Sequence, residues 1–108
     1  MDSPVTSILD ARNLTAAAEI RRDLDRAGIP AHLHGGLVRY VVDRIPPGHF
    51  MMALLSNDLV GVINRADTEN AALIKGWVSV LYNCEAIPCI SWGSKERVDA
   101  WLSGTSIR

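Results

Sequence analysis

Proline and glycine breaks divide this chain into short segments, and this division limits the fold more than any other feature. The clearest breaks are Gly28-Ile29-Pro30 and Pro46-Pro47-Gly48, because proline cannot continue a helix and glycine readily takes the left-handed conformation that ends one. Between the breaks, apolar residues recur three and four positions apart, as on one face of an α-helix. We therefore predict an all-α fold, a compact bundle of about five helices that forms a single domain over residues 1–108.

The first helix is predicted from an apolar stripe that runs from Leu14 through Ile20 and Leu24 to Ala27. The expected helices span residues 10–27, 37–45, 49–56, 57–83 (with a break near residue 66) and 94–103, and residues 1–9 and 105–108 are expected to be frayed. The β-branched run 38–42 also fits a strand, because short apolar runs are ambiguous. We favour a helix there, since Leu37, Val41 and Ile45 repeat every four residues.

Residues that suit helix ends stand at the expected boundaries. Asp67 and Ser94 are expected to cap the helices that follow them, and Ser56-Asn57-Asp58 predicts either a break or a new N-cap. Gly76 lies inside the most apolar helix, where glycine costs about 1 kcal/mol relative to alanine. It therefore predicts a close crossing with another helix.

Several classes of protein are not expected. No apolar run approaches the roughly 18–20 residues that cross a bilayer, and Met1-Asp2-Ser3-Pro4 lacks the charged and apolar regions of a signal peptide. We therefore expect a cytoplasmic protein that does not interact with membranes. Cys84 and Cys89 are then expected to be free thiols, Cys84 packing as a small apolar side chain.

The sequence favours neither a metal or cofactor site nor an enzyme. His32 and His34 could chelate a metal as a pair, but with His49 and the two cysteines they lack the regular spacing of structural zinc sites. We expect the two histidines to lie on a solvated turn. Neither a nucleophile motif nor a glycine-rich phosphate loop is present, so we expect no catalytic residues, no metal and no cofactor.

Nucleic-acid binding is an alternative, because nine of the eleven basic residues are arginines. The helix–break–helix segment 50–65 has the outline of a helix-turn-helix, yet its second helix offers only Asn64 and Arg65 for contacts with bases or phosphates. Acidic residues alternate with the arginines of helix 10–27, and the net charge is −1. A solvated face of mixed charge is the simpler interpretation of that helix.

A protein interaction surface is the remaining hypothesis. Methionine adapts to irregular partners, and tryptophan and arginine often anchor interfaces. Helix capping alone explains Asn57 and Asp67, and Arg65 is expected to pair with Asp67 or Glu69. Our candidate partner-binding residues are Met51, Met52, Asn57, Asp58, Arg65, Asp67 and Trp92.

One long stretch of the chain resembles known proteins. It includes Arg44-Ile45-Pro46-Pro47-Gly48-His49-Phe50, Arg65-Ala66-Asp67, Trp92-Gly93-Ser94 and Trp101-Leu102. It resembles small uncharacterised proteins encoded by phages and prophages, over about residues 37–103. The resemblance implies an origin in a mobile element, and hence the cytoplasm of a bacterial host cell as the place of action. It brings no shared activity with it.

We therefore expect a non-catalytic accessory protein that binds and inhibits a host protein or ribonucleoprotein complex, as anti-defence proteins such as anti-CRISPR proteins do. One alternative is a small DNA-associated regulator. Another is a self-associating structural protein, such as a homodimer, since a hydrophobic content of 48% in 108 residues can exceed what the core of a monomer takes up.

Overall fold

The computed structural model describes the backbone of residues 4–104 and the side chains of residues 11–104. Its helices are α1 (Pro4–Arg26), α2 (His34–Asp43), α3 (His49–Leu55), α4 (Leu59–Arg65), α5 (Thr68–Asn83) and α6 (Lys95–Ser103), with 3-10 turns η1 (Ala31–Leu33) and η2 (Cys89–Ser91). Over residues 4–104 there is no strand. The all-α prediction is confirmed, with six helices in place of about five, and the strand alternative for residues 38–42 is wrong.

The first helix begins earlier than predicted. The expected range 10–27 becomes α1, which starts at Pro4, because proline is well suited to the first turn of a helix. The expected frayed segment 1–9 is therefore helical from residue 4, whereas residues 1–3 and 105–108 lie outside the described residues. Gly28 ends α1 with a φ of +84°, as predicted.

The second helix also starts earlier and ends sooner than the predicted range 37–45. It begins at His34, takes in Gly35 and Gly36, which lie outside the predicted range, and stops at Asp43. Arg44 ends it in the left-handed region, with a φ of 56°. The cause is local: the backbone N–H of Arg44 bonds to carbonyls of the last turn, so this arginine replaces the usual glycine.

The predicted break near residue 66 is confirmed and divides the range 57–83 into α4 and α5. Asn57 supplies a left-handed residue (φ 59°) between α3 and α4, a conformation that asparagine tolerates better than most residues. Asp58 and Asp67 are the N-caps of α4 and α5, and Ser94 caps α6 as predicted.

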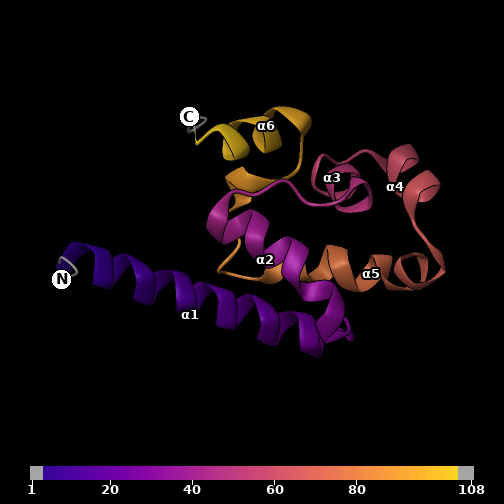
Figure 1. The fold of residues 1–108 in the computed structure, drawn as a ribbon. Helices are drawn as coiled ribbons and strands as arrows, with labels where there is room; N and C mark the ends of the chain where they lie inside the picture. The colour runs from indigo at the N-terminus through magenta and orange to yellow at the C-terminus, as the bar shows by residue number, and fades with distance from the viewer. Residues whose placement is uncertain (1–3, 105–108) are drawn as a thin grey trace.

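The helices form two groups (Figure 1). The long α1 runs along one side of the molecule, packs against α2 and α5, and extends beyond them at its N-terminal end. Gly76 lies at the crossing of α1 and α5, where a Cβ would be 2.9 Å from the carbonyl oxygen of Ala27, so the predicted close crossing is confirmed. The second group contains α3, packed against α4 and α6.

The core lies between these groups and around two aromatic side chains, Trp77 and Tyr40. The Tyr40 hydroxyl donates a hydrogen bond to the carbonyl of Ser91 over 2.6 Å, and the Ser91 hydroxyl donates to the carbonyl of Pro88. This chain of hydrogen bonds joins α2 to η2. The other large, fully buried apolar side chains among the described residues are Ile20, Leu24, Ile29, Leu37, Leu55 and Val98.

Two expectations about side chains are wrong. Leu14 belongs to the predicted apolar stripe but is 73% exposed, because α1 continues beyond the helices that cover its C-terminal half. His34, expected on a solvated turn, is only 2% exposed, and its Nε2 lies 2.7 Å from the carbonyl oxygen of Ile29. The early start of α2 carries His34 into the core.

Candidate functional site

Two adjoining hollows on the surface share His49 and Arg65, and we call them together the Arg65 groove. The charged lobe, of about 400 Å³, lies between α3, α4 and α6. The apolar lobe, of about 340 Å³, lies between the start of α2, the turn before α3, and the start of α5. Because Arg65 lines both, its side chain can contact a ligand in either lobe.

The apolar lobe has buried side chains at its base. Leu37, Met51 and Trp77 are each less than a tenth exposed and come from three different helices. Asp67 and Asn70 contribute polar groups to the same lobe. A hollow with an apolar lining and a few polar groups is suited to an inserted apolar side chain.

The charged lobe brings together ionic groups of both signs. It is lined by His49, Met52, Ala53, Ser56, Asp58, Arg65, Lys95 and Asp99. The ion pairs among the described residues join Arg22 to Asp23, His32 to Glu69, and His34 to Asp25. None of them includes a charge of this lobe, so Arg65, Lys95 and Asp99 are available to a partner.

The turn before α4 fixes the position of Asp58 and Arg65. The Asp58 carboxylate accepts a hydrogen bond of 3.0 Å from the backbone N–H of Gly61. A Cβ at Gly61 would overlap that carboxylate and lie 2.9 Å from Nη1 of Arg65. The absence of a side chain at residue 61 therefore allows both charged groups to lie over the same turn.

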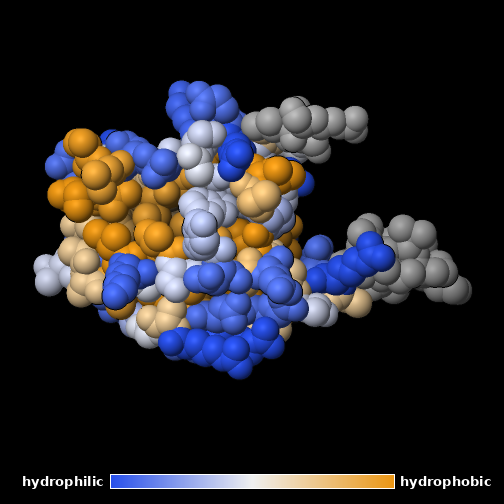
Figure 2. All heavy atoms as spheres, turned by 180° about the vertical axis from the view of Figure 1, so that it is seen from behind, coloured by the Kyte–Doolittle hydropathy of each residue, from blue (hydrophilic) through white to orange (hydrophobic). Residues whose placement is uncertain are grey.

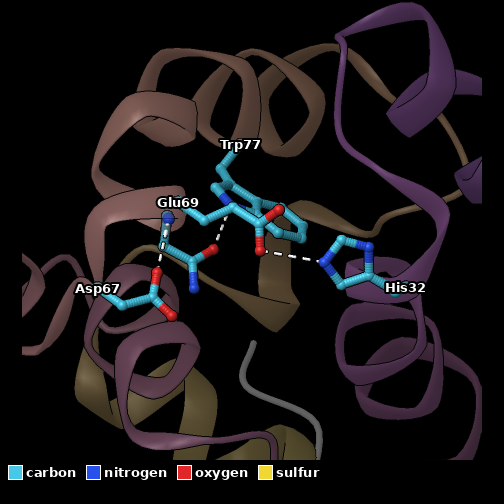
Figure 3. Close-up of polar contacts among 5 residues, drawn as sticks. His32, Asp67, Glu69 and Trp77 are labelled. Carbon is cyan, nitrogen blue, oxygen red and sulfur yellow. Dashed lines mark hydrogen bonds and ion pairs between the residues drawn. The ribbon is translucent and has the colours of Figure 1, made fainter.

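Hydrogen bonds order the start of α5 beside the apolar lobe (Figure 3). The Asp67 carboxylate accepts from the backbone N–H of Asn70 over 2.7 Å, and the Asn70 side-chain oxygen accepts from the indole N–H of Trp77 over 3.2 Å. Glu69 lies 3.0 Å from Nε2 of His32, which joins α5 to η1. The predicted pairing of Arg65 with Asp67 or Glu69 is wrong, because Asp67 caps α5 and Glu69 binds His32.

The groove collects five of the seven candidate partner-binding residues, namely Met51, Met52, Asp58, Arg65 and Asp67. Asn57 is exposed on the turn before α4 and does not line the groove. Trp92 packs against the core, and its buried indole N–H has no hydrogen-bond partner among the described residues.

Three titratable residues of the charged lobe, His49, Lys95 and Asp99, were not among the predicted partner-binding residues. Lys95 and Asp99 come from α6, which is far from α3 in the sequence. The spacing of Lys95 and Asp99, four apart at the start of a helix, did place them on one helix face. Nothing in the sequence indicated that α3 would lie opposite that face.

The groove contains a serine, a histidine and an aspartate without the contacts that activate a nucleophile. Ser56, His49 and Asp58 line the charged lobe, yet no hydrogen bond within the described residues joins Ser56 to His49 or His49 to Asp58. A catalytic serine requires such a bond to its base. Of the two free thiols, burial and a hydrogen bond to Asp23 raise the pKa of Cys84 to about 11.

Two further observations limit what the described residues can do. No three histidine, cysteine, aspartate or glutamate side chains among them are grouped closely enough to hold a metal ion. None of the helices within residues 4–104 combines the length and the apolar character needed to cross a membrane.

Comparisons of the chain with protein-family models, curated proteins and solved structures gave no match.

Proposed function

We propose that this chain is a non-catalytic protein that binds a segment of a larger host protein or ribonucleoprotein complex in the Arg65 groove. Binding covers a working surface of the complex and thereby inhibits it. The resemblance of residues 37–103 to phage and prophage proteins is the reason for proposing a host target of the anti-defence, anti-CRISPR-like class.

The observation that carries the proposal is that an apolar lobe meets, at Arg65, a lobe lined by charges of both signs that form no ion pair with another described residue. The apolar lobe takes one apolar side chain of the partner segment. Lys95 and Asp99 lie in the other lobe, where they select a segment that carries both an acidic and a basic residue. Charged groups of this kind contribute mainly to specificity and to the association rate, whereas the apolar contact contributes more of the affinity.

The two methionines give the groove the ability to adapt to such a segment. Met51 lines the apolar lobe and Met52 the charged lobe, on consecutive positions of α3. The unbranched methionine side chain has three rotatable bonds and fills irregular spaces. The groove can therefore close around an irregular peptide without a change in the backbone.

The test is retention of a host complex on the immobilised protein from nuclease-treated bacterial lysate, with groove variants beside the wild type. Lys95→Glu reverses a charge in the lobe, and it leaves the fold intact because an acidic residue is favourable in the first turn of α6. Arg65→Glu reverses the shared charge. Arg21→Glu is the matched control, since Arg21 is exposed on α1 away from the groove.

We expect one stoichiometric complex that wild type and Arg21→Glu retain and that both groove variants lose. The purified complex should also lose activity when the wild-type chain is added. Retention by Lys95→Glu and Arg65→Glu would contradict the assignment of the groove. Retention only when nucleic acid is left intact, with an affinity that falls steeply as salt rises, would favour the DNA-associated regulator.

A further inference from the structure

We propose that two copies of this chain associate through the outward side of α4, which we call the α4 face and define as Leu59, Val60 and Ile63. This surface is separate from the Arg65 groove. The proposal concerns the purified chain alone and does not depend on a host partner.

The α4 face is the reverse of what a surface helix normally presents. Leu59, Val60 and Ile63 are 72%, 69% and 61% exposed, whereas Gly61 and Val62 are the buried residues of the helix. Surface helices usually direct their large apolar residues toward the core. Here α4 packs chiefly against α3, so its larger apolar side has no partner within the described chain.

The apolar surface extends beyond α4. Figure 2 shows hydrophobic side chains gathered at the α4 end of the molecule and continuing across the face that α5 occupies. On α5, Val78 is 43% exposed and Ile74 is half-buried. The exposed parts of these side chains amount to roughly 400–500 Å² per copy, which is within the range of the largest apolar patch on an ordinary monomer, and such patches often have a function.

The size of this surface suits a second copy. Two such surfaces in contact would bury about 1,000 Å² or slightly more with their polar margins, which reaches the lower limit of a specific interface. A two-fold interface uses the same patch on both copies. Self-association therefore supplies the apolar patch with a partner surface of equal size and equally apolar character.

The absence of charge from the α4 face also favours a second copy over an unlike partner. Leu59, Val60 and Ile63 carry no charge, and the charged residues at the two ends of α4, Asp58 and Arg65, line the groove. Unlike partners are commonly selected by complementary charges, whereas homodimer interfaces are more apolar. A lipid surface would require basic residues beside the apolar face. On α4, the exposed neighbours of Ile63 are Val60 and Asn64, and neither of them is basic.

The dimer would leave both grooves open. At 3.6 residues per turn, Arg65 lies on roughly the opposite side of α4 from the centre of the α4 face. Two grooves in one particle would allow a complex with repeated subunits to be bound at two points, which raises the apparent affinity without any new contact.

The experiment is light scattering on the purified full-length chain over about a hundredfold range of concentration, because dimerisation follows mass action. We expect wild type to approach twice the monomer mass of 11.8 kDa. Leu59→Glu and Ile63→Glu should remain monomeric. Leu14→Glu is the matched control, since Leu14 is 73% exposed on α1, and it should dimerise like wild type.

A second measurement protects the test from variants that fail to fold. In a Cys89→Ser background, which removes the exposed native thiol, Val60→Cys should form a disulfide-linked dimer on mild oxidation, and Leu14→Cys should not. A wild-type chain that stays at the monomer mass at its highest soluble concentration would overturn the proposal. So would a Leu59→Glu variant that is folded and still dimeric, or a wild-type monomer that sediments with anionic lipid vesicles.

Discussion

The guanidinium of Arg44 lies 3.8 Å above the centre of the Trp101 ring, and its Nη1 donates a hydrogen bond of 2.8 Å to the carbonyl oxygen of the same residue. Trp101 in turn donates its indole N–H to the carbonyl of Tyr40 over 2.9 Å. One arginine therefore ends α2, through its left-handed backbone, and fastens α6 to it. Because α6 carries Lys95 and Asp99, this contact also positions one wall of the Arg65 groove.

Replacing Arg44 by alanine should lower the free energy of unfolding by about 1–2 kcal/mol, because the cation–π contact and a charged hydrogen bond are both lost. Arg44→Gly loses the same contacts but relieves the left-handed backbone, so it should be the more stable of the two variants. Urea denaturation followed by tryptophan fluorescence measures both. Equal stability of wild type and Arg44→Ala would show that the contact does not hold α6.

Gly76→Ala should destabilise the protein, although the same change in an ordinary helix interior stabilises by up to about 1 kcal/mol. The new Cβ would lie 2.9 Å from the backbone oxygen of Ala27 and 3.2 Å from Cδ1 of Ile29, and backbone cannot move aside without shifting α1. The matched control is Gly35→Ala, whose Cβ would meet only the mobile end of the Arg39 side chain. Thermal melting should show a lower Tm for Gly76→Ala and an unchanged or higher Tm for Gly35→Ala.

The local features of this fold could be predicted from the sequence, because they depend on a few neighbouring residues. Asp67 and Ser94 cap helices through backbone N–H groups three positions ahead, at Asn70 and Arg97. The same holds for Gly28, whose left-handed backbone ends α1. Gly76 is the exception, because it predicted a contact between two helices. A glycine within an apolar helix has few explanations other than close packing.

The predictions that were wrong concern features that depend on which helices pack against one another. The periodicity of Leu14 is the same as that of Ile20, yet only Ile20 has other helices over it. His34 is buried because α2 starts three residues earlier than predicted. The groove combines residues from α2 to α6. Met51, Met52, Asp58, Arg65 and Asp67 were found because they are close in sequence, whereas Lys95 and Asp99 come from a distant helix.

Asn70→Ala should reduce the free energy of unfolding by about 1–2 kcal/mol, because the indole N–H of the buried Trp77 loses its acceptor. Asn70→Asp retains a side-chain oxygen for that bond and adds a negative charge to the first turn of α5, where it is favourable. The aspartate variant should therefore match wild type in urea denaturation. If both variants are equally unstable, the Trp77 hydrogen bond is not the cause.

The buried thiol of Cys84 should make the protein less stable at high pH. Burial, with a hydrogen bond to Asp23, raises the pKa of Cys84 to about 11 from an ordinary 9.0. Between these two values the unfolded chain has lost the thiol proton and the folded chain has kept it, so rising pH favours unfolding. The stabilisation is complete below pH 9.0 and disappears as the pH rises through about 11. Urea denaturation at several pH values across this window should show a steady fall in the free energy of unfolding.

Two variants separate Cys84 from the other groups that titrate in the same range. Burial also raises the pKa of Tyr40, so wild type loses stability from two sources. Cys84→Ala should show a shallower fall of the free energy of unfolding with pH, and Cys89→Ala, at an exposed thiol, should keep the wild-type slope.

The two thiols should also differ in alkylation, because the thiolate is the reactive form. Native protein at neutral pH should take up one label, at Cys89, and a second only after unfolding. Two labels on the native chain would show that Cys84 is accessible and that its environment does not suppress ionisation.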